Sequence, residues 1–253
     1  MRSVIIIPAL NEEQAIGGVV RGVRDQVDQV IVVDNGSTDL TAKFAAEAGA
    51  KTVQVPTPGY GRACMAGVEA SEQADLIIFM DGDGADHPQD LQAVIEPILR
   101  GRSELVIGSR LIGQTETGAL TLAQRFGNRL ATELMRLLWG GRFTDLGPFR
   151  AITRTAYDKL QMQAQTYGWT VEMQVRALKH GLTYAEVPVR YRRRIGKSKI
   201  SGTVKGVCLA GWFILGTIFK EAIVSPKPSR KLNLIKDPRP PQQPSCHPSY
   251  KRG

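Results

Sequence analysis

The sequence predicts an α/β protein built on a Rossmann-like, mostly parallel β-sheet with helices on both faces. Short apolar runs of strand length alternate with segments of helical spacing, and these runs lack the in-out alternation of half-exposed strands. Polar motifs follow three of the runs. Because the carboxyl ends of parallel strands share one edge of a sheet, we expect these motifs to meet in space.

The first half of the chain carries the clearest alternation of strands and helices. The expected strands are 3–7, 29–33, 51–55, 76–80 and 104–108, and the expected helices are 12–25, 40–48, 61–70 and 89–100. The second half is predicted to be more helical. It contains expected helices over 120–139 and 169–180 and an expected strand over 184–191.

A charge-free apolar stretch over 206–219 is the last predicted element. A helix needs about twenty apolar residues to cross a bilayer, so this stretch predicts a buried or interfacial helix instead. We expect residues 1–224 to form the folded domain, with the apolar helix over 201–224, and residues 225–253 to form a disordered tail. The tail holds seven of the 14 prolines and seven Lys or Arg against one Asp, which gives it +6 of the net charge of +9.

The cysteines and the first residues bear on the compartment. Cys64, Cys208 and Cys246 are far apart and include no C-x-x-C pair, so neither a disulfide framework nor a zinc site is expected. The first apolar run is too short for a signal peptide, and we expect a reduced, cytoplasmic setting. The basic charge lies mostly in the tail and beside the apolar helix, without a nucleic-acid-binding module, so no nucleic-acid partner is expected.

The run Asp-Gly-Asp at 81–83 follows the apolar stretch 76–80. In extended chain, residues i and i+2 point to the same side, about 6–7 Å apart. Two carboxylates so placed suit a hard divalent cation that is shared with a diphosphate. An isolated run of this kind is more typical of a solvated turn, but the neighbouring motifs favour the cation site.

Polar motifs also follow the first two expected strands. After the first, Asn11 and Glu13 have the alternative interpretation of an ordinary helix start. After the second, Asp34 could accept hydrogen bonds from a base or ribose or form an Asx turn, and Asp39 could be a helix N-cap. The sequence contains neither G-x-G-x-x-G nor G-x-x-x-x-G-K-[ST], so dinucleotide-binding and P-loop sites lack their main support.

These motifs together resemble the family 2 glycosyltransferases of GT-A fold. The resemblance covers roughly residues 3–220 and rests on the stretches 8–12, 34–39 and 81–88. The later stretches 108–110, 145–150 and 194–199 are similar to the branch of dolichyl- and polyprenyl-phosphate mannosyl- and glucosyltransferases. The chain departs from this branch at Gly147 and Pro148, where Ser-Gly is frequent, and at Gly84, where many members carry an apolar residue.

The resemblance implies a nucleoside diphosphate sugar as donor, a GDP- or UDP-hexose, bound by residues 1–110. It assigns the nucleoside pocket to Pro8, Leu10, Glu12 and Asp34. Asp81 would contact ribose or metal, and Asp83 would be the principal ligand of Mg²⁺ or Mn²⁺. A divalent cation offsets the charge of the departing diphosphate. His87 would be a third metal ligand, or it only shapes the turn before Pro88.

The resemblance to this branch also implies a polyprenyl phosphate acceptor, dolichyl or undecaprenyl, bound by residues 111–224. A phosphate monoester is largely ionised at neutral pH, so it needs cations to hold it more than a base to activate it. The expected cations are Arg110, Arg125, Arg194 and Lys199, and Arg110 is favoured because it follows the fifth strand. A lone arginine is otherwise more often a surface residue. Asp145 is the candidate for a further catalytic or orienting acid.

Seven basic residues over 190–205, with no acid among them, precede the apolar helix. They predict contact with an anionic membrane surface, and the alternative is a solvated basic loop before a core helix. We therefore expect an inverting, metal-dependent hexosyltransferase, peripheral at the cytoplasmic membrane face. The alternatives are a glycosyltransferase with a small soluble acceptor, a noncatalytic sugar-nucleotide or membrane-binding protein, and a nucleotidyltransferase. The sequence leaves the oligomeric state open, and a homo-oligomer is compatible with it.

Overall fold

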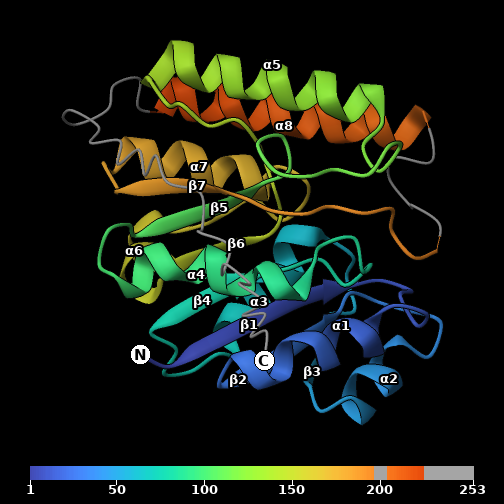
Figure 1. Ribbon diagram of the computed structural model, residues 1–253. Helices are drawn as coiled ribbons and strands as arrows, with labels where there is room; N and C mark the ends of the chain where they lie inside the picture. Colours follow the sequence, from blue (N-terminus) through green and yellow to red (C-terminus); the bar gives the residue numbers. More distant parts are fainter. Residues whose placement is uncertain (197–203, 225–253) are drawn as a thin grey trace, which may run out of the picture.

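The computed structural model describes residues 1–196 and 204–224, and these form a seven-stranded sheet covered by helices (Figure 1). The strand order is β3-β2-β1-β4-β6-β5-β7, and every neighbouring pair is parallel except the two pairs that involve β6. The predicted α/β fold with a mostly parallel sheet is confirmed. The strands are β1 Ser3–Ala9, β2 Gln29–Asp34, β3 Lys51–Gln54, β4 Leu76–Phe79, β5 Leu105–Ser109, β6 Arg150–Thr153 and β7 Tyr184–Pro188.

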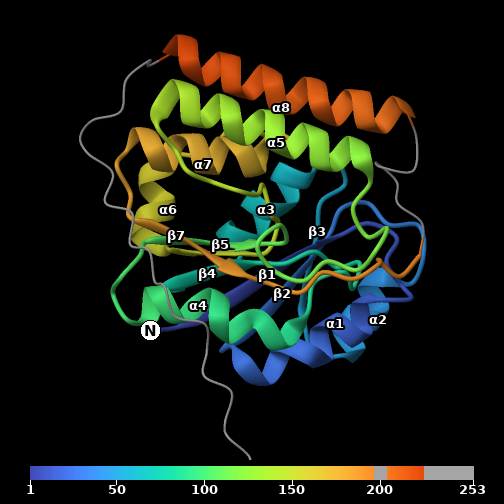
Figure 2. The ribbon, with the colours of Figure 1, turned by 45° about the horizontal axis from the view of Figure 1, so that its top comes forward.

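Helices cover both faces of the sheet, as Figure 2 shows after a turn of the molecule. Helices α1, α2 and α4 pack on one face, and α3, α6 and α7 pack on the other. Helices α5 and α8 lie outside α7 as a further layer. The bounds are α1 Ile16–Val23, α2 Thr41–Glu47, α3 Tyr60–Glu69, α4 Leu91–Leu99, α5 Leu122–Trp139, α6 Arg154–Leu160, α7 Trp169–Lys179 and α8 Val204–Val224.

Side chains of β1 alternate between the two cores of the molecule. Ile5 and Ile7 pack against α1 and α4, whereas Val4 and Ile6 pack against α3. All four are fully buried. An apolar run without polar alternation is therefore what a central strand with helices on both faces requires.

Strand β6 and helix α6 were not predicted from the sequence. β6 has only four residues and lies antiparallel between β4 and β5. Its apolar run is too short to be recognised as a strand in the sequence, and its partner strands are remote in the chain. Because β6 and β7 complete the sheet of the first half, residues 1–110 and 111–224 share one sheet.

Helix α8 is longer than the apolar stretch 206–219 that predicted it, and it is fixed to α7 by ion pairs. Glu221 is buried and accepts a hydrogen bond from Lys179 Nζ at 2.6 Å and one from Arg176 Nε at 3.0 Å. Among the described residues, none of the helices combines the length and apolar character needed to cross a bilayer. Lys199, residues 201–203 of the predicted helix and the predicted tail 225–253 lie outside the described residues.

Candidate active site

The loops that follow β1 and β2 are held together by hydrogen bonds at the carboxyl edge of the sheet, which faces right in Figure 1. Asn11 N donates to Ser37 Oγ at 2.9 Å, and Thr38 N donates to Asn11 Oδ1 at 2.7 Å. Asn11 has φ 51°, and α1 begins only at Ile16. The interpretation of Asn11 as an ordinary helix start is therefore wrong, because its side chain joins two loops instead.

The side chain of Asp34 forms a turn with its own loop. It is buried at the end of β2, and its Oδ1 accepts a hydrogen bond from Ser37 N at 2.9 Å. This is the Asx-type contact that the sequence left as an alternative. Asp39 Oδ1 likewise accepts from Thr41 N at 3.0 Å, while Leu40 occupies the N-cap position of α2.

The four residues predicted for the nucleoside pocket lie near one another at this edge. Ala9 pairs with Asp34 in the parallel register, so the residues that flank Ala9 adjoin Asp34. Pro8 is buried within β1, whereas Leu10 and Glu12 are partly exposed in the loop beyond it. The sheet thus brings these side chains together, and their ligand remains a prediction.

Three carboxylates gather in the loop that follows β4. Asp81 Oδ1 accepts a hydrogen bond from Tyr60 Oη at 3.0 Å, and Asp83 Oδ1 accepts one from Ala85 N at 2.9 Å. Asp86 is 1% exposed, and its Oδ2 lies 3.4 Å from Asp81 N. The other oxygen, Asp86 Oδ1, is buried without a hydrogen-bond partner among the described residues.

Burial and the charges of neighbouring acids raise the pKa values of two of these carboxylates, Asp81 and Asp86. Burial, together with the charge of Asp83, raises the pKa of Asp81 to about 7. Burial, with the charges of Asp81 and Asp83, raises the pKa of Asp86 well above its ordinary value. Where several acids lie close together, a bound cation stabilises their ionised forms. The cluster therefore has the charge character of a cation site.

The donor set fits a divalent cation that takes only part of its ligands from the protein. In the described part of the chain, no group of three or more His, Cys, Asp or Glu side chains is arranged to hold a metal ion. Asp81, Asp83 and His87 are therefore not assembled into a three-ligand site, and burial and two nearby arginines lower the pKa of His87. Mg²⁺ commonly uses one or two carboxylates and completes its shell with phosphate oxygens and water. Asp83 and Asp81 fit that arrangement.

Arg110 and Asp145 form a buried ion pair beside the carboxylates. Arg110 Nε donates to Asp145 Oδ2 and Nη2 to Oδ1, each at 2.8 Å, and the backbone N of Arg110 also donates to Oδ2 at 2.8 Å. Burial alone would raise the pKa of Asp145, but the ion pair and hydrogen bonds hold it below its ordinary value. The Arg110 guanidinium also lies over the Tyr191 ring, 5.0 Å from the centroid. Asp145 thus orients Arg110.

The other predicted phosphate-binding residues are placed differently from one another. The Arg194 guanidinium forms an ion pair with Glu12, and its Nη1 lies 3.5 Å from Asp83 Oδ2. It thus contacts acids predicted for the donor. Arg125 is exposed on the first turn of α5, and its side chain has no hydrogen bond or ion pair with the other predicted residues in the ranges 1–196 and 204–224.

Gly147 stands where the similar glycosyltransferases frequently carry serine, and the structure offers a steric reason for the glycine. A Cβ at this position would overlap the carbonyl oxygen of Gly108, so the backbone would have to move to admit a serine. The loop is also fixed by Arg150, which is fully buried and donates hydrogen bonds to the carbonyl oxygens of Leu146 and Gly147. Arg150 shapes the loop that carries Asp145.

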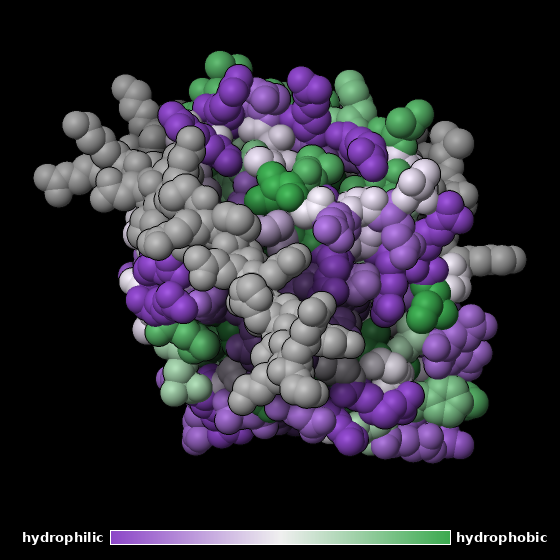
Figure 3. Space-filling model, in the orientation of Figure 1, coloured by the Kyte–Doolittle hydropathy of each residue, from purple (hydrophilic) through white to green (hydrophobic). Residues whose placement is uncertain are grey.

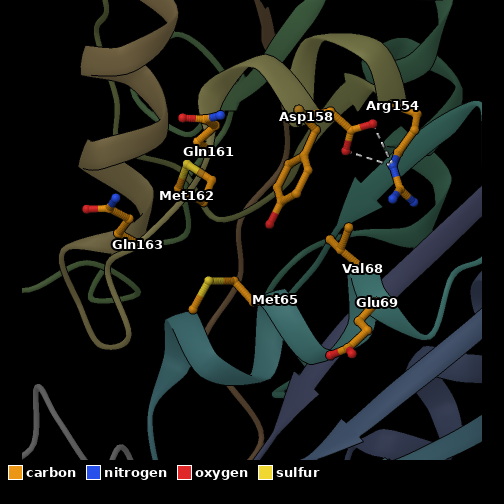
Figure 4. A pocket seen from close by; sticks show the side chains of 9 residues that line it. Met65, Val68, Glu69, Arg154, Asp158, Gln161, Met162 and Gln163 are labelled. Atoms are coloured by element: carbon orange, nitrogen blue, oxygen red, sulfur yellow. Dashed lines mark hydrogen bonds and ion pairs between the residues drawn. The ribbon is translucent and has the colours of Figure 1, made fainter.

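A separate cavity of about 510 Å³ lies between α3 and α6 (Figure 4). None of the predicted site residues lines it. Arg154 and Asp158 form an ion pair on the α6 side of the cavity. Arg154 directly follows Thr153, and Thr153 pairs with Leu76 at the amino end of β4. The cavity is therefore at the end of the strand opposite to Asp81. Its lining residues are Met65, Val68, Glu69, Arg154, Tyr157, Asp158, Gln161, Met162 and Gln163.

Four residues of the site were not predicted from the sequence. Tyr60 contacts Asp81, Asp86 completes the acidic cluster, Tyr191 stacks on Arg110, and Glu186 accepts hydrogen bonds from the backbone N of Thr144 and Asp145. Asp86 carried a signal, because it is the third acid in six residues. The other three gave none, since each joins the site through the packing of distant elements.

Comparison with known proteins identifies similar sequences and folds. The family described as Glycosyl transferase family 2 matches residues 4–161. Glycosyltransferase AglJ of Haloferax volcanii is 33% identical over 192 residues, which cover 75% of this chain but only 63% of that protein. An undecaprenyl-phosphate mannosyltransferase of Micrococcus luteus is 29% identical over 221 residues, covering 81% of this chain and 90% of that protein.

The fold is shared with a solved enzyme structure. Glucosyl-3-phosphoglycerate synthase from Mycobacterium tuberculosis, in complex with Mn²⁺, UDP-glucose and phosphoglyceric acid, has a TM-score of 0.68 at 23% identity. The match covers 87% of this chain and 79% of that one.

Proposed function

Because the chain belongs to glycosyl transferase family 2 and is a glycosyltransferase, we propose that it transfers a hexose from a nucleoside diphosphate sugar to a polyprenyl phosphate. The transfer would invert the anomeric carbon in a single displacement. The observation that carries the proposal is the acidic cluster of Asp81, Asp83 and Asp86, which faces the cations Arg110 and Arg194 at the carboxyl edge of the sheet.

The donor side would use the carboxylates for a divalent cation and the loops after β1 and β2 for the nucleoside. Asp83 and Asp81 would hold Mg²⁺ or Mn²⁺, which would offset the charge that develops on the departing diphosphate. Asp34 and Glu12 would face the nucleoside. The mycobacterial synthase with the same fold was crystallised with Mn²⁺ and UDP-glucose, which supports this type of donor complex.

The acceptor side would use Arg110 to hold an anionic oxygen near the donor. Two N–H groups of its guanidinium are bonded to Asp145, and none of the described residues accepts a hydrogen bond from Nη1. A phosphate acceptor is already ionised, so its oxygen can attack without a general base. Asp145 keeps the charge and the orientation of Arg110 fixed while the phosphate binds. Arg125 and Lys199 stay predicted ligands of the same phosphate.

Exposed apolar side chains on α5 and α8 favour a lipid acceptor. On α5, Leu122 and Leu137 are 85% and 81% exposed, and on α8, Trp212 and Ile223 are 76% and 83% exposed. Figure 3 shows hydrophobic side chains exposed among hydrophilic ones in the upper layer, where these helices lie. Arginines on α5 are also exposed, so this layer combines apolar and cationic groups. Such a surface suits an anionic membrane.

Thermal-shift measurements with UDP-, GDP- and dTDP-sugars, each with and without Mn²⁺, test the donor. We expect one nucleotide class to raise the melting temperature only when Mn²⁺ is present, because binding to the native state alone stabilises it. Asp83→Asn should abolish this shift, whereas Asp158→Asn, which changes an exposed ion pair, should keep it. A metal-dependent shift of wild-type size in Asp83→Asn would overturn the metal assignment.

A transfer assay separates the lipid acceptor from a small soluble one. The mycobacterial synthase carries phosphoglyceric acid, so the same fold accommodates an acceptor of that kind. With the identified donor, we expect labelled hexose to enter undecaprenyl or dolichyl phosphate and not 3-phosphoglycerate. Transfer to 3-phosphoglycerate alone would replace the lipid proposal with the soluble one. Loss of all transfer and hydrolysis would leave the noncatalytic alternative.

A further inference from the structure

The guanidinium of Arg194 lies between two carboxylates on the donor side of the site. Its Nη2 pairs with Glu12 Oε1, and its Nη1 is 3.5 Å from Asp83 Oδ2. The side chains of Glu12 and Asp83 are each 10% exposed, so little water screens these charges. A positive charge of the protein itself therefore lies against the carboxylate that is proposed to hold the donor's cation.

The backbone on either side of this guanidinium is fixed by a basic strap, residues 189–196, that runs along the loop after β4. Arg192 N donates to Ala85 O at 3.0 Å, and Ile195 N donates to Asp83 O at 2.9 Å. In Figures 1 and 2 the orange segment after β7 follows the carboxyl edge of the sheet. The strap thus places the arginine over the acids.

The strap has further anchors that do not involve the acidic side chains of the donor side. Tyr191 forms backbone bridges with Asp86 on one side and Thr115 on the other. Arg193 donates to the carbonyl oxygen of Thr117 through Nε at 3.0 Å and through Nη2 at 2.8 Å. Because these contacts hold the backbone, the side chain of residue 194 can leave its carboxylates while the strap stays in place.

The contact with Glu12 and Asp83 leaves the guanidinium incompletely bonded. Arg194 Nε is buried and has no hydrogen-bond partner among the described residues. An unsatisfied buried donor opposes the arrangement that leaves it so. A phosphate offers three acceptor oxygens and charge-assisted bonds to a guanidinium. An arriving phosphate is therefore a better partner once the carboxylates have another cation.

We propose that Arg194 changes partners during the reaction. It neutralises Glu12 and Asp83 before the donor binds, and it turns to the acceptor phosphate when the donor's divalent cation takes Asp83. The inference rests on the proposed function and adds an order to it. The donor must displace an internal cation, which lowers its apparent affinity, and the acceptor phosphate gains its second cation only after that displacement.

Calorimetry with Arg194→Gln tests the competition on the donor side. The glutamine keeps much of the length of the side chain but removes its charge. With UDP or GDP and Mn²⁺, we expect the variant to bind the nucleotide about 3- to 10-fold more tightly than wild type, because no internal cation has to leave. Arg154→Gln is the control, since Arg154 pairs with Asp158 at the end of β4 opposite to Asp81, away from the strap, and its nucleotide affinity should equal that of wild type.

The same measurement with farnesyl phosphate, a short prenyl phosphate, tests the order of binding. Wild type should bind this probe about 5-fold or more tightly when the nucleotide and Mn²⁺ are present than when they are absent. Arg194→Gln should lose this dependence, while Arg154→Gln keeps it. Thermal unfolding of each variant without ligand establishes that it is folded before its affinities are compared.

The outcomes distinguish this inference from the proposed function. If Arg194→Gln binds the nucleotide with Mn²⁺ as tightly as wild type or more weakly, Arg194 does not compete with the metal, and the inference is overturned. Farnesyl phosphate binding that is unaffected by the nucleotide also overturns it. In both cases metal-dependent nucleotide binding by wild type leaves the proposed function standing. If wild type binds neither UDP nor GDP with Mn²⁺ or Mg²⁺, the proposed function and the inference both fail.

Discussion

Arg110 and Asp145 face each other through a two-point ion pair, with Nε–Oδ2 and Nη2–Oδ1 distances of 2.8 Å. Arg110 follows β5, and Asp145 precedes β6, which pairs antiparallel with β5. The pair therefore connects the end of one strand to the entrance of its neighbour. It also fixes the direction in which the remaining guanidinium N–H groups of Arg110 point.

Asp145→Ala should destabilise the protein and remove transfer activity. The Asp145 side chain is 1% exposed and that of Arg110 is 13% exposed, so the substitution leaves a mostly buried, unpaired cation. Breaking such a pair costs about 3–5 kcal/mol of unfolding free energy. Urea unfolding measures this loss. Nucleotide binding should persist in the folded fraction, because the carboxylates of the loop after β4 are unchanged.

Asp158→Ala provides the comparison for that result. Asp158 pairs with Arg154 on the surface, where both side chains are at least one-third exposed. Removing an exposed pair of this type changes the unfolding free energy by at most about 1 kcal/mol. Equal effects of the two substitutions would contradict the structural role of the Arg110–Asp145 pair.

Gly147→Ser should destabilise the loop that carries Asp145. A Cβ at position 147 overlaps the carbonyl oxygen of Gly108, and backbone must move to admit it. Overpacking of this type costs about 1–3 kcal/mol. Gly127→Ser on α5, where a Cβ meets nothing within 4 Å, is the control and should leave the urea midpoint nearly unchanged. An equally stable Gly147→Ser protein would show that this loop is not confined as described.

The pH dependence of stability should report the burial of Glu186. Burial raises the pKa of this carboxyl to about 7 from an ordinary value of 4.5. Between these two values the native state holds a proton that the unfolded state has lost, so the unfolding free energy falls as pH rises through this window. Below pH 4.5 and above about pH 7, Glu186 should not make the unfolding free energy depend on pH.

Glu186→Gln should remove this contribution, because an amide has no proton to lose. The difference in unfolding free energy between wild type and variant should change from pH 4.5 to pH 7 in favour of the variant. Gly127→Ser, which changes no titratable group and meets nothing within 4 Å, should show no such change over this window. If the unfolding free energies of wild type and Glu186→Gln change with pH in parallel, the pKa of Glu186 is not raised by burial.

The elements that the sequence predicted well are those fixed by local pattern. The strands β1 to β5 and the helices between them follow from alternating apolar runs, and the carboxyl edge follows from their parallel order. The loops after β1 and β2 are hydrogen-bonded to each other there as expected, and Gly82 of the loop after β4 lies against Ala9 at the end of β1. The loop after β4 was predicted as an acidic site because Asp81 and Asp83 follow a buried strand directly.

The elements that the sequence did not predict depend on contacts between distant segments. Strand β6 is only four residues long and is defined by its neighbours β4 and β5. Asp86 pairs with the strap through its bridge with Tyr191, which lies 105 residues further along the chain. Arg194 was predicted beside the acceptor phosphate, but the parallel pairing of β7 with β5 carries its strap to the acids of the donor side.

The exposed apolar side chains of α5 and α8 should bind anionic membranes. Helices α5 and α8 lie side by side, and Leu137 and Trp212 are 81% and 76% exposed on them. The measurement is flotation with vesicles of phosphatidylglycerol and phosphatidylcholine in a density gradient. Leu137→Ser and Trp212→Ser should each reduce the fraction of protein that floats with the vesicles, since each removes a large apolar side chain from the acyl boundary. Leu99→Ser is the control, because Leu99 is 53% exposed on α4, which covers the opposite face of the sheet. If wild type stays entirely in the dense fraction, or if Leu99→Ser reduces flotation as strongly as Trp212→Ser, the α5–α8 layer is not the membrane-binding surface, and the soluble acceptor becomes the better proposal.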